Sequence, residues 1–403
     1  MRPMPHLNAG IISILILILG SLGFDIYARS LEQRYVNALA PLDLTQTING
    51  IALQRAALYQ PDLLPVYGSS EITMIDTPYD AEKFFATYPT GFTVFQVANL
   101  GAASLTMAQD LAALGPDLRG KKIVISFSPA TFTMSKLPPD YYAGNFSPLH
   151  AYEMIFSPYL SMGLRIDAAK RMSDFPATLQ DDSFLDFVII QMTRASRANR
   201  ILYYMSWPLG ELQITTMRLQ DHVEVVFYLW SHWVNPNVKK IPQTIDWSNA
   251  FSSALAEQKQ HTLSNSLGVE DEDWWWYQHV VTNPIPAGSE DKSFTYRVEQ
   301  HPEWTDLDIL LRVLQESGAR PLILSRPMNV HLWEALGVSG HAQNIYYLKL
   351  NDIVNQYQLP LVDYQQHGTD IYFSIDQGAH TSRYGWVYVD QTLDEFFHGQ
   401  IRP

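Results

Sequence analysis

The sequence predicts an α/β protein built on a parallel sheet, with a large, mainly helical insertion and one N-terminal transmembrane helix. Three observations predict this fold. Residues 9–24 form an uncharged apolar run. Residues 63–128 alternate between short apolar strand patterns and a helical pattern, which is typical of a doubly wound parallel sheet. The alternation returns at 321–364, after a long interval of different character.

The composition indicates a folded protein and excludes several classes of function. Of 403 residues, 47% are hydrophobic and 17% are charged, which is enough apolar material for a large core. The net charge of −14 opposes nucleic-acid phosphates, so we expect no nucleic-acid partner. The absence of cysteine excludes disulfides, thiolate nucleophiles and cysteine-bound metals. His222 and His232 lack a metal-binding spacing, so we expect neither metal nor cofactor.

The apolar run at 9–24 predicts a membrane anchor, which we place at residues 1–29. Sixteen helical residues rise about 24 Å, slightly less than the hydrocarbon core of a bilayer. A cleaved signal peptide is the alternative, but its nearest A-x-A pattern, Ala38-Leu39-Ala40, lies well beyond the run. The positive-inside rule places the tail with Arg2 in the cytoplasm. We therefore expect a single-pass protein of the cell (inner) membrane with an extracytoplasmic body.

The body begins with a helical lead-in and the first half of the sheet. Residues 30–60 space their apolar side chains at helical intervals and predict a stalk. Apolar strand patterns follow at 63–67, 92–99 and 123–128, with a helical pattern at 103–114 between the second and third. These elements open an α/β domain that we assign to residues 61–403.

The second half of the sheet follows an insertion at about 130–320. Strands are predicted at 321–327 and 359–364, with a helix at 341–358 between them and a closing helix after Gly385. Within the insertion, we interpret the aromatic segments 223–234 and Trp274–Tyr277 as buried packing elements. The alternatives are a re-entrant or interfacial piece at 223–234 and a sugar-stacking or membrane-surface segment at Trp274–Tyr277.

The turn Gly68-Ser69-Ser70-Glu71 stands immediately after the first predicted strand of the sheet. The carboxyl edge of a parallel sheet is where ligands and reacting groups gather, so Ser70 is a candidate nucleophile. The turn is not a G-x-S-x-G elbow, because position 72 is isoleucine. A small polar turn that caps a helix is the structural alternative.

An Asp and a His near the C-terminus supply the other groups that a serine nucleophile needs. Asp376 and His380 lie four residues apart between the last strand pattern and the last helix. A serine nucleophile requires a base, and the base requires an orienting carboxylate. Because both segments belong at the carboxyl edge of one sheet, we expect them to share a pocket. Asp370 and Asp363 are the alternative carboxylates.

Several stretches of the chain together resemble the DltD family, membrane-anchored proteins of cell-envelope D-alanylation, which is similar in turn to the SGNH/GDSL hydrolases. The matching stretches are LLPVYGSSEIT, VFQVANLGAASLTMAQDLAAL, IVISFSPATF and YFSIDQGAHTSRYGWVYVD. The resemblance covers the anchor and roughly residues 55–135 and 320–395, and it implies an SGNH-like (flavodoxin-like) sheet. Two departures stand out. Three residues instead of the family's usual two separate Asp376 from His380, and the family's SPQWF segment reads SPATF at 128–132.

The resemblance implies roles for the candidate residues. Ser70 would be the nucleophile, His380 the general base and Asp376 the group that orients the imidazole. For the oxyanion hole we favour the backbone N–H groups of Ser70 and Gly101; a plain strand-to-helix turn is the alternative at Gly101.

The implied function is an extracytoplasmic acyltransferase that moves a D-alanyl ester onto a cell-envelope polymer of the lipoteichoic-acid type. The expected partners are a membrane-embedded O-acyltransferase with its D-alanyl donor system, and the lipid-anchored polymer as acceptor. An SGNH esterase or thioesterase and a polysaccharide O-acetyltransferase remain the nearest alternatives. A scaffold that recruits an acyl-carrier protein or the O-acyltransferase without catalysis is a third.

Overall fold

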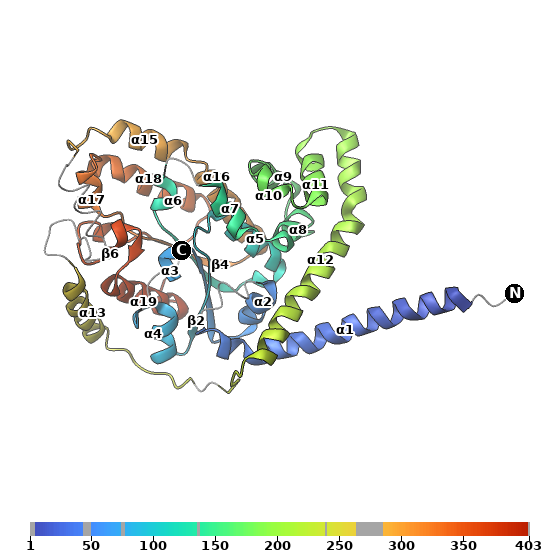
Figure 1. Ribbon diagram of the computed structural model, residues 1–403. Coiled ribbons are helices and arrows are strands. Elements are labelled where there is room, and N and C mark those ends of the chain that lie inside the picture. The colour runs from blue at the N-terminus through green and yellow to red at the C-terminus, as the bar shows by residue number, and fades with distance from the viewer. Residues whose placement is uncertain are drawn as a thin grey trace.

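The computed structural model is an α/β body from which one long helix projects (Figure 1). It describes residues 5–42, 50–73, 77–134, 138–237, 240–262 and 285–401. The predicted packing element Trp274–Tyr277 lies outside these residues.

Five parallel strands form the central sheet. They are β1 (Leu63–Gly68), β2 (Thr93–Ala98), β3 (Lys122–Phe127), β4 (Arg320–Ser325) and β5 (Leu361–Val362), in the order β2-β1-β3-β4-β5. Each neighbouring pair is parallel. The strands before and after the insertion therefore form one sheet, and the predicted fold class is confirmed.

Helices account for most of the rest of the described chain. The first part contains α1 (Pro5–Leu39), α2 (Ile51–Tyr59), α3 (Ser70–Thr73), α4 (Ala81–Thr87) and α5 (Ser104–Leu114). Between β3 and β4 lie α6 (Ala130–Thr133), α7 (Pro139–Asn145), α8 (Pro148–Ile155), α9 (Met162–Met172), α10 (Pro176–Leu179), α11 (Ser183–Thr193), α12 (Arg197–Ser231), α13 (Trp247–His261), α15 (Asp291–Gln300) and α16 (Glu303–Ser317). The last part contains α17 (Val330–Ala335), α18 (Gly340–Gln356) and α19 (Arg383–Phe397).

The sheet is buried on both faces, as the apolar strands require. Side chains alternate along a strand, so Leu63 and Tyr67 of β1 join the larger core cluster, whereas Leu64 and Val66 join the smaller one. Helices α2, α5, α8 and α16 contribute to the larger cluster, and α4 and α19 contribute to the smaller. This two-sided packing fixes the sheet and with it the loops at its carboxyl edge.

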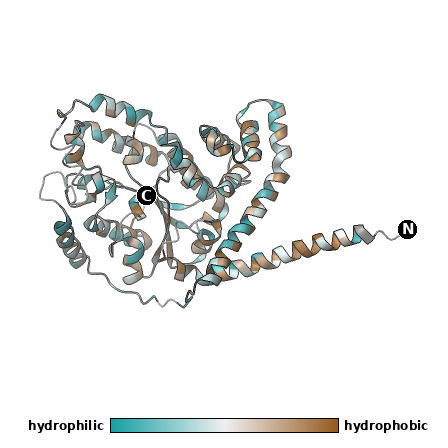
Figure 2. Cartoon of the chain, viewed as in Figure 1, coloured by the Kyte–Doolittle hydropathy of each residue, from teal (hydrophilic) through white to brown (hydrophobic). Residues whose placement is uncertain are grey.

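Helix α1 contains the predicted anchor and continues beyond it into the body. Its stretch from Asn8 is long and apolar enough to cross a membrane, and the most apolar part has no buried residues. Figure 2 shows the hydrophobic colour concentrated along this projecting part of α1. The helix runs without a break to Leu39, just before Pro41. It is therefore a candidate membrane anchor joined rigidly to the first part of the predicted stalk.

One sequence interpretation is wrong in part. The sequence predicts a buried segment at 223–234, but this segment forms the end of α12 and the loop after it. Val225 and Val226 are buried, whereas Phe227 is 68% exposed, Trp230 70% and Trp233 92%. A helix buries only the stripe that faces its neighbours, so half of this apolar segment faces outward.

Candidate active site

The serine turn is held by hydrogen bonds on both sides of Ser70. The backbone N–H of Ser69 donates to Oε1 of Glu71 at 2.9 Å, and Oγ of Ser69 donates to the carbonyl oxygen of Asn99 at 3.1 Å. Gly68 has no side chain to obstruct this arrangement, since a Cβ there would lie 2.7 Å from Oε1 of Glu71. Ser69 and Glu71 are buried, while Ser70 at the start of α3 is partly exposed. The turn thus leaves Ser70 as its accessible hydroxyl.

Asp376 and His380 lie in a short hairpin whose geometry brings them into contact. Strands β6 (Ser374–Ile375) and β7 (His380–Thr381) pair antiparallel, and a tight turn at Asp376–Gly378 joins them. Asp376 has φ +47° and Gly378 has φ +81°. Oδ2 of Asp376 lies 2.6 Å from Nδ1 of His380. The two side chains are in direct contact, although no hydrogen bond from Nδ1 of His380 is formed among the described residues.

Burial differs between the two members of this pair. His380 is buried, whereas the Asp376 side chain is 45% exposed. Interaction with His380 holds the pKa of Asp376 below its ordinary value, against a smaller opposing effect of burial. Asp376 is therefore a carboxylate at neutral pH and can stabilise a positive charge on the imidazole.

The serine turn and the Asp–His hairpin meet at the carboxyl edge of the sheet. Helix α3 packs against β7, so the segment that begins at Ser70 lies beside the segment that begins at His380. The serine turn also contacts the ends of β2 and β3. Oγ of Ser128, which follows β3, donates to the carbonyl oxygen of Ala379 at 3.4 Å. The hairpin is thereby attached to the sheet. A hydrogen bond between Ser70 and His380 stays a prediction.

The alternative carboxylates are engaged elsewhere. Oδ1 of Asp370 accepts the N–H of Tyr372 at 3.0 Å, and Oδ2 of Asp363 accepts from Asn351 at 3.3 Å. Of these three acids, Asp376 is the one in contact with His380.

Gly101 lies in the loop between β2 and α5, in a conformation that favours glycine. Its φ is +74°, and a Cβ there would lie 2.9 Å from the ring of Tyr141. The next N–H, that of Ala102, donates to the carbonyl oxygen of Asn99 at 3.0 Å and closes a turn. The turn geometry alone explains why a glycine occupies position 101. Its role as an oxyanion donor stays a prediction.

Sequence reasoning missed a group of buried charges beneath the serine turn. Arg326, which follows β4, is 1% exposed, and its Nη2 donates to the carbonyl oxygen of Glu71 at 3.4 Å. Its guanidinium lies over the ring of Trp386, 4.9 Å from the ring centroid. Nε and Nη1 of Arg326 and both carboxyl oxygens of Asp390 have no hydrogen-bond partner among the described residues. The available signal was an arginine directly after a buried strand, at the edge where sites form.

Burial shifts the pKa values of Glu71, Asp390 and Arg326 in the direction that favours the neutral form of each side chain. Burial raises the pKa of Glu71, opposed by the N–H of Ser69 and by Arg326, with a smaller contribution from His380. Burial also raises the pKa of Asp390 well above its ordinary value and lowers that of Arg326. Perturbed groups beside a reactive residue are typical of functional sites.

A cavity of about 420 Å³ adjoins the serine turn. Its walls include Gly68 and Asn99 at the ends of β1 and β2, and also Asp110, His150 and Asp221. Ser70 is not part of its lining, so the cavity lies next to the candidate nucleophile rather than around it. Asp110 pairs with His150, and Asp221 accepts a backbone N–H, so both carboxylates already have partners.

Comparisons with known proteins identify the family of this chain. Residues 44–398 match the family described as DltD protein. The chain is 27% identical over 352 residues to Protein DltD of Bacillus subtilis (strain 168), covering 86% of each chain. It is 22% identical over 366 residues to Protein DltD of Staphylococcus aureus (strain NCTC 8325 / PS 47), covering 89% of this chain and 87% of the relative. The resemblance stated from the sequence motifs is confirmed, and this chain belongs to the DltD family.

Proposed function

We propose that this protein transfers a D-alanyl group to a teichoic-acid-type polymer of the cell envelope through an acyl-enzyme on Ser70. Membership of the DltD family supports the substrate class. The observation that carries the chemistry is the packing of α3 against β7, which sets the serine turn beside a histidine in contact with a carboxylate.

The first half of the reaction forms the acyl-enzyme. Oγ of Ser70 attacks the carbonyl carbon of the D-alanyl donor while its proton passes to Nε2 of His380. Nδ1 of the same ring faces Asp376, so Nε2 is the nitrogen left for the serine. As the tetrahedral intermediate collapses, the bond to the donor's leaving group breaks, and that group takes the proton from His380.

The second half returns the enzyme to its starting state. A hydroxyl of the acceptor polymer gives its proton to Nε2 of His380 and attacks the ester carbonyl. The bond between Oγ of Ser70 and the D-alanyl carbon then breaks, and Oγ regains a proton from His380. Backbone N–H groups of Ser70 and Gly101 are the proposed donors to the oxyanion in both steps, and one such donor contributes roughly 10²- to 10³-fold to the rate.

Transfer rather than hydrolysis requires that the acceptor hydroxyl reach the acyl-enzyme before water does. A candidate anchor on the same chain holds the site near a lipid-anchored acceptor and raises its effective concentration. The proposed donor partner is a membrane-embedded O-acyltransferase, and the body lies on the extracytoplasmic side.

Covalent labelling of Ser70 tests this proposal. The full chain in proteoliposomes, given a D-alanyl donor, should gain the mass of one alanyl group in a hydroxylamine-sensitive linkage. Ser70→Ala should abolish both this adduct and polymer esterification. Ser69→Ala is the matched control, because Ser69 is the neighbouring hydroxyl, and it should still form the adduct.

The same experiment separates the alternative functions. Rapid loss of the adduct to water, whether or not the polymer is present, would indicate an esterase. Full polymer modification by Ser70→Ala at equal protein abundance would indicate a scaffold and overturn the proposal.

A further inference from the structure

Helix α12 has two apolar faces, and only one of them packs against the body. The buried face is formed by residues at helical spacing, namely Tyr203, Gly210, Ile214 and Val225, and it also carries the buried carboxyl of Asp221. On the opposite side a second set of large apolar side chains is exposed to solvent. This set, which we call the outer stripe, comprises Ile201, Leu202, Met205, Leu209, Leu212, Val223, Phe227 and Trp230.

The spacing of the outer stripe places its members on one side of the helix. Ile201 and Leu202 are adjacent, and from Leu202 onwards successive members are three or four positions apart, except for eleven between Leu212 and Val223, which is close to three full turns. Met205 is 71% exposed and Trp230 70%. Exposed apolar patches of this extent mark an interaction surface.

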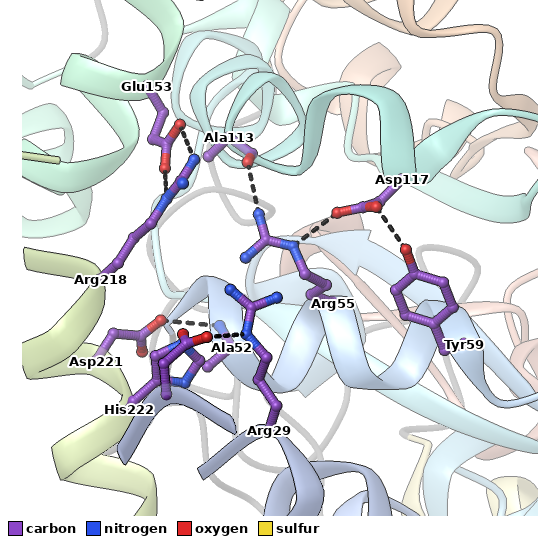
Figure 3. Close-up of polar contacts among 11 residues, drawn as sticks. Arg29, Ala52, Arg55, Tyr59, Ala113, Asp117, Glu153, Arg218, Asp221 and His222 are labelled. Atoms are coloured by element: carbon purple, nitrogen blue, oxygen red, sulfur yellow. Dashed lines mark hydrogen bonds and ion pairs between the residues drawn. The ribbon is translucent and has the colours of Figure 1, made fainter. Parts of the chain in front are cut away.

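Charged side chains of α12 lie outside the stripe. Arg218 turns towards the body and pairs with Glu153 through both of its carboxyl oxygens (Figure 3). Glu211 accepts from Nε1 of Trp207 at 3.0 Å. The stripe spans about 45 Å, from about 1.5 Å per residue over its thirty positions, and consists of two apolar parts with the exposed polar side chains of Thr216 and Gln220 between them.

The end of the stripe lies where α12 joins the candidate membrane anchor. Nδ1 of His222 lies 2.6 Å from Oε1 of Glu32, and Nε2 lies 3.2 Å from Oδ1 of Asp25. Asp25 is the first charged residue after the apolar run of α1, and it pairs with Arg29 at 2.9 Å. The contact between α1 and α12 is therefore at the level where α1 would leave the hydrocarbon. Figure 1 shows α12 rising from this junction along the side of the body that faces the projecting anchor.

We propose that α12 lies along the membrane surface, with its outer stripe in the boundary between headgroups and acyl chains. A bilayer crossed by the apolar part of α1 would begin near Asp25, beside Val223 and the tryptophan at the end of α12. Tryptophan is enriched at this depth of the membrane, and amphipathic helices bind there through an apolar face. The opposite face of α12 is packed on the body, so the helix lies on the membrane and does not cross it.

We infer that lipid covers the outer stripe, because the stripe lies next to the exposed apolar part of α1. The two apolar surfaces meet at the polar contact between His222 of α12 and Asp25 and Glu32 of α1. This inference does not depend on the chemistry of Ser70. It has a consequence for the site, since Met217, Gln220 and Glu224 of α12 form one wall of the cavity beside the serine turn. Docking of α12 would set that cavity next to the membrane.

Site-directed spin labelling of the full chain tests the proposal directly, because the sequence contains no cysteine. Leu212→Cys and Phe227→Cys place a nitroxide on the outer stripe, and Thr215→Cys is the matched control on an exposed lateral position of α12. The proteins are reconstituted in vesicles of phosphatidylcholine and phosphatidylglycerol. Collisions with dissolved oxygen and with an aqueous nickel complex are then compared.

A lipid-bound stripe gives a several-fold higher ratio of oxygen to nickel collisions at 212 and 227 than at 215. Equal ratios at the three positions would overturn the proposal. Low collision rates with both reagents would also overturn it, because they indicate cover by protein, either a second copy or a partner. Quenching of a fluorophore at the same cysteines by brominated acyl chains gives an independent reading, and its absence at 212 and 227 would contradict a lipid contact.

Discussion

The guanidinium of Arg326 donates to the backbone carbonyl of Glu71 at 3.4 Å, although 255 positions separate the two residues. Glu71 in turn accepts the N–H of Ser69, so the contact links the end of β4 to the serine turn. The arginine is buried, and two of its nitrogens have no partner in the described part of the chain, which costs stability. This arrangement is expected where position and charge at the serine turn matter more than stability.

Replacement of Arg326 should therefore separate activity from stability. We expect Arg326→Met to lower kcat for polymer esterification about tenfold, which corresponds to the loss of one charge-assisted hydrogen bond. The free energy of unfolding should stay equal or rise, because methionine removes a buried guanidinium of which two nitrogens have no hydrogen-bond partner among the described residues. Arg320→Met, at the exposed start of the same strand, should change neither quantity. Thermal unfolding and steady-state kinetics check both expectations. A large loss of stability with unchanged kcat would contradict them.

Asp376 should matter for catalysis through its charge. We expect Asp376→Asn to lower kcat by roughly 10²- to 10⁴-fold, because the imidazole loses both its orientation and its counter-charge. Asp370→Asn is the matched control and should remain close to wild type.

Since the pKa of Asp376 is lowered by His380, the wild-type carboxylate is ionised well below neutral pH. Its contribution to stability is present above the unfolded pKa of about 3.9 and is lost as the pH falls through the folded pKa. Activity profiles between pH 5 and 8 should show no recovery of the Asp376→Asn variant. Equal losses in the two variants would contradict the assignment.

Gly101 and Gly120 offer a matched test of the loop at the site. Their φ angles are +74° and +72°, so alanine at either position costs about 1–2 kcal/mol in backbone strain. A Cβ at Gly101 also meets the ring of Tyr141 at 2.9 Å, whereas a Cβ at Gly120 meets nothing within 4 Å. We expect Gly101→Ala to be the more destabilised by about 1 kcal/mol or more in chemical unfolding. It should also lose activity, which Gly120→Ala should retain. Equal stability and equal activity of the two variants would contradict a special requirement for glycine at position 101.

The strands and the Asp–His pair could be predicted because their determinants are local. Each strand is a short apolar run between turn residues, and the predicted strand at 63–67 is found at Leu63–Gly68. Only three residues separate Asp376 from His380, so a short hairpin brings them together. Only Leu361 and Val362 pair at the edge of the sheet, in place of the longer strand predicted at 359–364.

The buried charges and the outer stripe depend on contacts that no local pattern contains. Arg326 meets Glu71 because the sheet order places β4 and β1 on either side of β3. The segment 223–234 is apolar on two sides, and only packing against α1 and the body decides that Val225 is buried while Trp230 is exposed. Sequence periodicity identifies such a helix but not which face its neighbours cover.

The junction of α2 and α12 should make stability depend on pH through Asp221. This buried carboxyl accepts the N–H of Ala52 at 2.8 Å and so caps α2 (Figure 3). Gly50 is required there, because a Cβ would lie 1.5 Å from Oδ1 of Asp221. Burial raises the pKa of Asp221 to about 6, opposed by the N–H of Ala52, His150 and His222 and assisted by Glu32.

The sign of the resulting effect follows from the raised pKa. Because the folded protein holds the Asp221 proton more tightly than the unfolded chain, stability falls as the pH rises from about 4 to about 6. The full cost, at most roughly 3 kcal/mol for a shift of about two pH units, is present at neutral pH. Asp221→Asn keeps an acceptor for Ala52 without titrating, so its unfolding free energy should exceed that of the wild type at pH 7 and converge with it near pH 4. His150, whose pKa is raised by Asp110 against the effect of burial, is present in both proteins and should largely cancel in the difference. Thermal unfolding of both full chains in nanodiscs from pH 4.5 to 7.5 measures this difference. A constant difference across that range would show that Asp221 does not titrate there and contradict the raised pKa.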